Sequence, residues 1–194
     1  MPSSLDKVLA EIDAINAQDP NLEHDGEKDV AKELLYGQRM SACLAEYWPN
    51  ANEYVAIAVR AQHIKRWSIA RGEYPESKKG YLDWRKALGV MHAELASQLM
   101  LENGYSEEEA NRTAAIIRKE RLKSNEDSQT LEDVACLVFL MYYFAPFAAK
   151  HEDDKVVSIV KKTWKKMSSH AQNIALAFTL PEHLGKLVQR ALSN

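Results

Sequence analysis

Hydrophobic residues recur every three or four positions along most of the chain, and this spacing is typical of amphipathic helices. The first segment shows the pattern clearly: Leu5, Val8, Ile12 and Ile15 fall on one side of a helix that Ser3 can cap. Alternation with a period of two, which is typical of strands, is nearly absent. The pattern therefore predicts an all-α protein.

Turn and capping residues divide the rest of the chain into further helices. Asn103-Gly104 ends one helix, and Ser106 with Glu109 three residues later is a capping box for the next. Residues 19–26 are polar and are expected to form a loop. After the first helix, the predicted helices cover about 28–47, 55–74, 81–103, 106–122, 131–144, 156–167, 169–178 and 182–192.

Composition narrows the class of protein. Hydrophobic residues make up 46% of the 194 residues, which is enough for one sizeable core, and the net charge of −3 argues against a general nucleic-acid binder. Cys43 and Cys136 are isolated, so a disulfide scaffold and a zinc ribbon are not expected. Charges near the N-terminus do not fit a signal peptide, and the longest apolar run, 134–149, is too short for a membrane span. We expect a cytoplasmic protein that does not enter a membrane.

One segment, residues 55–74, combines apolar residues with a cluster of basic and aromatic ones. If it is helical throughout, Arg60, His63, Trp67 and Arg71 fall within about 80° of one another. A histidine and two arginines on a partly apolar face need partners. These could be acidic side chains in internal salt bridges, a metal or an anionic ligand.

Three other predicted helices each place one polar residue on an apolar face. His92, Glu120 and Asp133 occupy these positions, and His63 adds a second imidazole. Two histidines and two carboxylates inside a helical bundle form a ligand set that suits zinc, iron or manganese. Alternatively, the imidazoles pair with the carboxylates and no metal is bound.

The run that begins at His92 resembles the second half of an HD-domain protein. That superfamily shows a histidine opening a helix, a glycine-aromatic-Ser/Thr turn, and an Asp-containing leucine motif. This chain has His92-Ala-Glu-Leu-Ala, Gly104-Tyr105-Ser106, residues 117–120 (IRKE) and residues 131–137 (LEDVACL). The signatures IDAINAQDPN, RAQHIKRW and TLEDVACLVFL are similar to a family known as domain of unknown function 4202 and cover most of the chain. The resemblance implies one HD-like domain of about eight or nine helices over residues 1–194, with a core at 28–147 and flanking packing helices at 1–18 and 152–194.

The chain departs from the HD pattern at three positions. Tyr36 stands where the first metal-binding histidine is expected, Ile64 replaces the aspartate of the HD pair, and Glu120 stands at the third histidine position. His63, His92 and Asp133 are retained as residue types. The resemblance thus implies either a remodelled metal site of His63, His92, Glu120 and Asp133, holding zinc, manganese or iron, or a site without metal.

Two functions follow from this resemblance. The first is a metal-dependent enzyme that acts on a small anionic, phosphorylated substrate, as a phosphate-ester hydrolase or an oxygenase, with the same four residues as the catalytic set. The second is a binding or partner protein that has kept the fold and lost the reaction. Arginine forks suit phosphate oxygens, and a tryptophan can stack on a ring. The expected substrate-binding residues are Arg60, Arg66, Trp67, Arg71 and Lys119.

Overall fold

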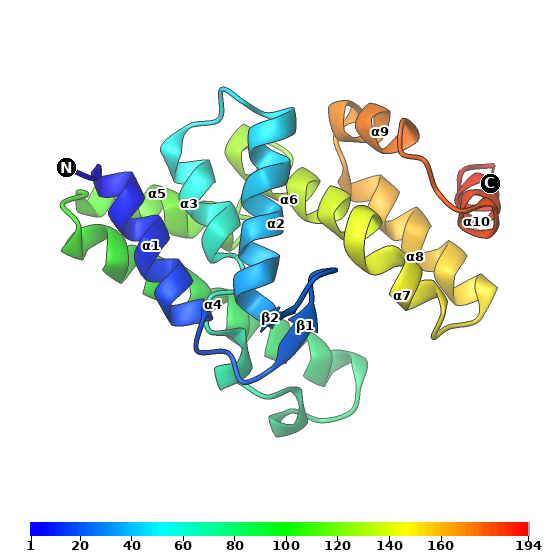
Figure 1. Cartoon of the computed structure of the whole chain (residues 1–194), viewed down its shortest axis with the longest axis horizontal. Helices are drawn as coiled ribbons and strands as arrows, with labels where there is room; N and C mark the ends of the chain where they lie inside the picture. The colour runs from blue at the N-terminus through cyan, green and yellow to red at the C-terminus, as the bar shows by residue number, and fades with distance from the viewer. Residues whose placement is uncertain (194) are drawn as a thin grey trace. The chain divides into compact units, whose positions relative to one another are not determined.

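The structure is a computed structural model that describes residues 1–193. Within these residues it contains ten α-helices and one small two-stranded sheet (Figure 1). The prediction of an all-α protein is therefore confirmed. The elements are α1 Ser4–Asn16, β1 Leu22–His24, β2 Asp29–Ala31, α2 Lys32–Tyr47, α3 Glu53–Ala61, η1 Arg66–Ser68, η2 Arg71–Glu73, α4 Lys78–Glu102, α5 Glu107–Ile117, α6 Glu126–Val138, η3 Phe139–Tyr143, α7 Phe144–Ala148, α8 Asp153–Lys166, α9 Ser169–Leu176 and α10 Glu182–Leu192.

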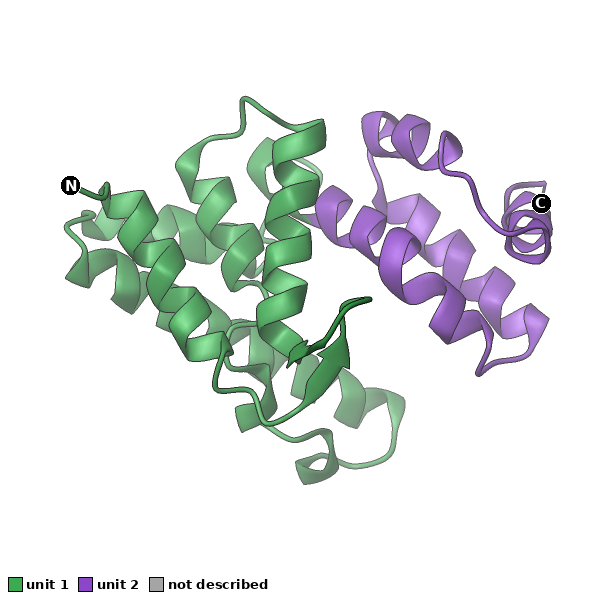
Figure 2. Cartoon of the chain, viewed as in Figure 1, with its two compact units in different colours: residues 1–131 green, residues 132–194 purple. Residues whose placement is uncertain are grey.

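The chain divides into two compact units, residues 1–131 and residues 132–194 (Figure 2). In unit 1, α3 is the central helix and contacts α1, α2, α4 and α5. Its apolar residues are buried, among them Ile57 and Val59. In unit 2, α8 packs against α7 and α10, and Phe144 and Val160 are buried. The division into a core at 28–147 and flanking helices stays a prediction.

The capping residues that the sequence indicated do cap their helices. Ser3 Oγ accepts the N–H of Asp6 at 3.1 Å, and Ser106 Oγ accepts the N–H of Glu109 at 3.3 Å, each within a full capping box. Asn52 caps α3 through a 3.0 Å bond from the N–H of Val55. Local side-chain chemistry therefore fixes where these helices begin.

The polar stretch after α1 was expected to be a loop, and this prediction is wrong at residues 22–24, which form a strand. Strands β1 and β2 form an antiparallel hairpin beside α2, with Glu23 opposite Val30. An ion pair between Glu23 and Arg39 connects the hairpin to α2. Strands of three residues are too short to show alternation in the sequence, which explains the error.

The prediction of one helix over residues 55–74 is also wrong. Helix α3 ends at Ala61, Lys65 adopts a left-handed conformation with φ of 53°, and the short turns η1 and η2 follow. His63 and Trp67 therefore do not share an α-helical face with Arg60. A left-handed residue that is not glycine leaves no signal in the sequence.

Helix α5 ends five residues earlier than predicted, and this changes the position of Glu120. The N–H of Glu120 donates to the carbonyl of Ala115 at 3.0 Å, and Lys119 has a φ of 55°. This is a Schellman motif with lysine where glycine is usual. Glu120 thus lies beyond the helix, and its predicted place on an apolar face of α5 is wrong.

One helical segment among the described residues, Glu126–Ala148, is long and apolar enough to cross a membrane by length and composition. It comprises α6, η3 and α7. Half of its most apolar window is buried, a property that the core helices of globular proteins also show. The expectation that the chain does not enter a membrane stays a prediction.

Candidate functional site

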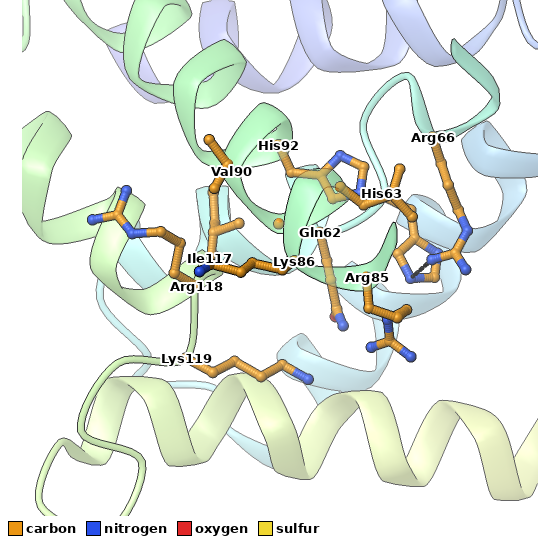
Figure 3. Close-up of a pocket in the computed structure, with 12 residues that line it drawn as sticks. Gln62, His63, Arg66, Arg85, Lys86, Val90, His92, Ile117, Arg118 and Lys119 are labelled. Carbon is orange, nitrogen blue, oxygen red and sulfur yellow. Dashed lines mark hydrogen bonds between the residues drawn. The ribbon is translucent and has the colours of Figure 1, made fainter. Parts of the chain in front are cut away.

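Unit 1 contains a cavity of about 380 Å³ (Figure 3). Its size lies within the range of small-molecule sites. Three segments form it: the turn after α3, the middle of α4, and the last residues of α5 with the turn that follows. The lining residues are Gln62, His63, Arg66, Arg85, Lys86, Leu88, Gly89, Val90, His92, Ile117, Arg118 and Lys119.

Helix α4 supplies half of the lining because its helical period brings several residues to one side. Arg85, Leu88 and His92 are separated by three and four residues and so lie on one face. The start of the helix is fixed by Ser77, whose Oγ accepts the N–H of Gly80 at 3.0 Å. A Cβ atom at Gly80 would lie 2.2 Å from the carbonyl oxygen of the preceding loop, so only glycine fits there.

His63 is held between an acidic and a basic side chain. Its Nδ1 lies 3.2 Å from Glu33 Oε2, and its Nε2 lies 3.1 Å from Arg66 Nη1. A guanidinium can only donate, so Nε2 is the acceptor and Nδ1 carries the proton that it donates to Glu33. Burial, reinforced by the charge of Arg66, holds the pKa of His63 well below its ordinary value. The imidazole is therefore neutral and fixed in one tautomer, and it stacks on Tyr36 with ring centroids 4.0 Å apart.

His92 is also neutral and fixed in one tautomer. Its Nδ1 lies 2.7 Å from the carbonyl oxygen of Ile64, which can only accept, so Nδ1 carries the proton. Burial, with a further contribution from His63, lowers the pKa of His92 to about 3. The two imidazole centroids are 6.2 Å apart. The structure thus brings His63 and His92 together at the cavity.

Glu33 is a buried acid beside this pair, with 5% of its surface exposed. Burial raises its pKa from 4.5 to about 7, although the charge of Arg66 acts in the opposite direction. The Glu33 N–H is accepted by the carboxylate of Asp19 at 3.1 Å, which fixes the first turn of α2. Glu33 therefore orients His63 from a firmly held position.

The cavity is strongly basic. Figure 3 shows the Arg85 and Lys119 side chains extending toward the amide of Gln62. Arg66 lies over the Trp84 ring, 4.9 Å from its centroid, and this contact fixes the guanidinium beside the cavity. Among the lining residues, five carry a positive charge and none is an aspartate or a glutamate: Arg66, Arg85, Lys86, Arg118 and Lys119.

Comparison with models of protein families identifies one family that matches the chain. Residues 6–188 match the model of the family described as a domain of unknown function (DUF4202). The chain belongs to the DUF4202 family. No curated protein and no solved structure matches it. The match to the family model extends over parts of both compact units of this DUF4202 protein.

Two of the predicted substrate-binding arginines of the DUF4202 chain have other partners. Arg60 forms a bidentate ion pair with Asp13, with nitrogen–oxygen distances of 2.6 and 2.5 Å. Arg71 donates to the carbonyl oxygens of Tyr74 and Pro75 at 2.9 and 3.0 Å. Neither residue lines the cavity.

The remaining predicted binding residues divide between the cavity and its surroundings. Arg66 and Lys119 line the cavity, whereas Trp67 is half-buried and does not. The prediction that Trp67 lies on one helical face with His63 is wrong, because α3 has ended before both residues. Two of the five predicted binding residues thus belong to the cavity.

The four predicted metal ligands are placed unequally. His63 and His92 lie together, but both nitrogens of His63 are engaged by neighbouring side chains. Glu120 is exposed and forms an ion pair with Arg118 at 2.6 Å. The prediction that Glu120 reaches the interior depended on a longer α5, and the Schellman turn removes that basis.

Asp133 belongs to unit 2 and has a capping role there. Its carboxylate accepts hydrogen bonds from the N–H of Ser168 at 2.7 Å and from the Ser168 hydroxyl at 2.5 Å. Ser168 is the N-cap residue of α9. Within residues 1–193, no group of three or more His, Cys, Asp and Glu residues is arranged to hold a metal ion. The metal site of His63, His92, Glu120 and Asp133 stays a prediction.

Several residues of the site were missed by sequence reasoning. Glu33 and Gln62 reach the site from elements whose relative placement no local pattern reveals. Arg85 could have been found, because it lies seven residues before His92 and so on the same helical face. Lys86 also lines the cavity, but it lies six residues before His92 and so carries no such signal.

Proposed function

We propose that this DUF4202 protein binds a small anionic, phosphorylated molecule in the cavity of unit 1. The observation that carries the proposal is the set of five cationic side chains around a cavity that, in the part of the chain that the structure describes, no carboxylate lines. Arginine and lysine side chains are the usual partners of phosphate oxygens, and a concave basic surface concentrates anions.

Two arginines of unit 1, Arg60 and Arg118, form ion pairs with carboxylates. Arg60 is neutralised by Asp13, and Arg118 pairs with Glu120. Arg118 therefore contributes less to the attraction of an anion than its formal charge suggests. Glu33 offsets only part of the positive charge beside the cavity, because its pKa of about 7 leaves it about half protonated at neutral pH.

A second candidate function is hydrolysis of a bound phosphate ester, and the Glu33–His63 contact is the observation that favours it. An anion that draws Arg66 toward itself would free His63 Nε2 to accept a proton from water. The water oxygen would then bond to phosphorus while the bond from phosphorus to the ester oxygen breaks, and the leaving ester oxygen would take the proton from the His63 imidazolium. Burial holds the pKa of His63 well below its ordinary value, so the imidazole is a weak base. Binding is therefore the first proposal and hydrolysis the second.

A distant relationship to the HD-domain superfamily also belongs among the proposals. His63, His92 and Asp133 support it as retained residue types, whereas Tyr36 and Ile64 replace two residues of the HD pattern. The metal-dependent hydrolase or oxygenase that the resemblance implies would require His63 to leave its present partners, whereas His92 Nε2 has no hydrogen-bond partner among the described residues. Because both nitrogens of His63 are engaged, the site favours a binding protein over a metal-dependent enzyme.

The test is calorimetric titration with inorganic phosphate, on the wild type and on two charge reversals of α4. Lys86→Glu places a negative charge in the cavity lining, and Lys79→Glu makes the same change on an exposed residue outside it. We expect Lys86→Glu to weaken phosphate binding about ten- to hundredfold and Lys79→Glu to leave it unchanged. If the wild type does not bind phosphate, or if both variants lose binding equally, the proposed site is wrong.

A further inference from the structure

Two buried polar atoms of the cavity residues have no hydrogen-bond partner among the described residues: Gln62 Oε1 and His92 Nε2. Gln62 is 8% exposed and His92 is 3% exposed. Buried polar atoms without partners are rare in native proteins, and each one calls for an explanation. Both residues line the same cavity, so a ligand is an explanation that accounts for both atoms.

The chemistry of the His92 atom is fixed. Nδ1 carries the proton because the Ile64 carbonyl can only accept, and the neutral ring then leaves Nε2 as a lone-pair acceptor. A hydrogen-bond donor on a ligand would satisfy it. The cationic side chains around the cavity are themselves donors, and they suit the oxygens of an anion.

Gln62 adds a second acceptor from the turn after α3. Its amide offers one oxygen and one NH2 group, and rotation about its last side-chain bond exchanges them. A hydroxyl group is both donor and acceptor, so it can satisfy the amide in either orientation. In Figure 3 the amide points toward the ends of Arg85 and Lys119, where an anionic group would be held.

The rest of the lining indicates what joins these groups. Leu88, Val90 and Ile117 provide an apolar wall that can cover a carbon skeleton. Among the described residues, no phenylalanine, tyrosine or tryptophan lines the cavity, so a stacking platform for a nucleobase is not present there. The lining suits a short hydroxylated chain or ring.

We propose, building on the function proposed above, that the ligand is a small polyol or sugar phosphate whose hydroxyl groups donate to His92 Nε2 and Gln62. The phosphate would lie among Arg66, Arg85 and Lys119. The hydroxyl groups would reach the two buried acceptors, and the carbon skeleton would lie on the apolar wall.

The test compares two phosphate esters with the same three-carbon chain, glycerol 3-phosphate and propyl phosphate. At pH 8 both phosphates are dianions, so propyl phosphate has no donor, whereas glycerol 3-phosphate has two hydroxyl groups. Calorimetry on the full chain should show glycerol 3-phosphate binding about tenfold more tightly, the combined effect of two hydrogen bonds that each contribute about threefold.

Two variants locate the effect. His92→Asn keeps a donor for the Ile64 carbonyl and removes the Nε2 acceptor, and Gln62→Met keeps an unbranched side chain and removes the amide. In each variant the affinity ratio of the two esters should fall toward one, while propyl phosphate binds within about twofold of wild type. Thermal melting checks that both variants are folded. The affinity ratio of the two esters for the wild-type protein tests the proposal even if a variant does not fold.

The outcomes separate this inference from the function on which it rests. If neither ester binds, the phosphate site itself is wrong. If both bind equally well to the wild type, the phosphate site stands and the hydroxyl requirement is refuted, with bound water then satisfying His92 Nε2. If the preference persists in both variants, the hydroxyl groups are read by other residues and the assignment fails.

Discussion

Two buried carboxylates, Glu33 in unit 1 and Asp133 in unit 2, show how differently the same chemical group can be used. Asp133 accepts two short hydrogen bonds from Ser168, and both bonds secure the beginning of α9. Glu33 accepts from the His63 imidazole at 3.2 Å, and its burial raises its pKa to about 7. One carboxylate is well satisfied by its surroundings, whereas the other is held in a state unfavourable for a charge.

The difference extends to the residues around each acid. Near Glu33, the His92 Nε2 acceptor has no hydrogen-bond partner within residues 1–193. Cationic side chains line the adjoining cavity, and one of them, Lys119, has a left-handed backbone conformation. Each of these features lowers the stability of the fold. Their concentration around one cavity is typical of a functional site, because binding can require groups that folding alone does not favour. Three predictions test this contrast.

The largest effect is expected at Asp133. Asp133→Ala leaves the Ser168 N–H and hydroxyl without their acceptor, and it should reduce the free energy of unfolding by about 4 kcal/mol. Glu120→Ala is the matched control, because it removes an acid from an exposed ion pair and should change stability by less than about 1 kcal/mol. Urea denaturation followed by circular dichroism measures both. Equal effects would mean that Asp133 is no more important to the fold than a surface acid.

A smaller and pH-dependent effect is expected at Glu33. Its pKa is raised from 4.5 to about 7, so the folded protein binds this proton more tightly than the unfolded chain does. The contribution of Glu33 is therefore fully present below about pH 4.5 and is lost as the pH rises to about 7. Glu33→Gln keeps an acceptor for His63 and removes this loss, so at pH 8 the variant should be more stable than wild type by on the order of 3 kcal/mol.

The pH profile of the Glu33 variant should keep a second feature. The pKa of His92 is lowered to about 3, so its contribution is lost as the pH falls from 6.5 toward 3, in the wild type and in Glu33→Gln alike. Denaturation at pH values from 4 to 8 separates the two effects. A variant less stable than wild type at pH 8 would contradict the prediction, because it would show that the ionised Glu33 carboxylate stabilises the fold instead of weakening it.

The smallest effect is expected at the turn after α5. Lys119 and Arg121 have φ angles of 55° and 52°, which glycine adopts without strain. Lys119→Gly and Arg121→Gly should each raise the free energy of unfolding by about 1 kcal/mol. Only Lys119 lines the cavity, so only Lys119→Gly should weaken phosphate binding. Loss of binding in both variants would indicate that the turn, rather than the Lys119 side chain, supports the site.

The sequence predicted the helical fold well because helix formation here is a local property. The boxes at Ser3 and Ser106 mark two helix starts, and the three- and four-residue spacing indicates nearly every helix. The errors occur where the backbone leaves the helical conformation without glycine or proline, at Lys65 and Lys119. The hairpin was missed because its strands are only three residues long.

The candidate site was predictable only in part, for a similar reason. His63, His92, Arg66 and Lys119 were found from residue type and resemblance, and all four line the cavity. Glu33 was missed because its role depends on the packing of α2 beside the turn that carries His63, and no spacing within α2 encodes that contact. Local patterns thus identify groups that can do chemistry, but tertiary packing decides which of them meet.

The most direct test of the central claim is nuclear magnetic resonance of protein labelled with 15N at histidine, titrated with glycerol 3-phosphate. The chain has six histidines, and two of them line the cavity. We predict that the ring resonances of His63 and His92 shift together along one binding curve. The other four should not move: His24, His151, His170 and His183. If the cavity pair stays unchanged while phosphate binds, or if the other histidines shift instead, the cavity of unit 1 is not the binding site.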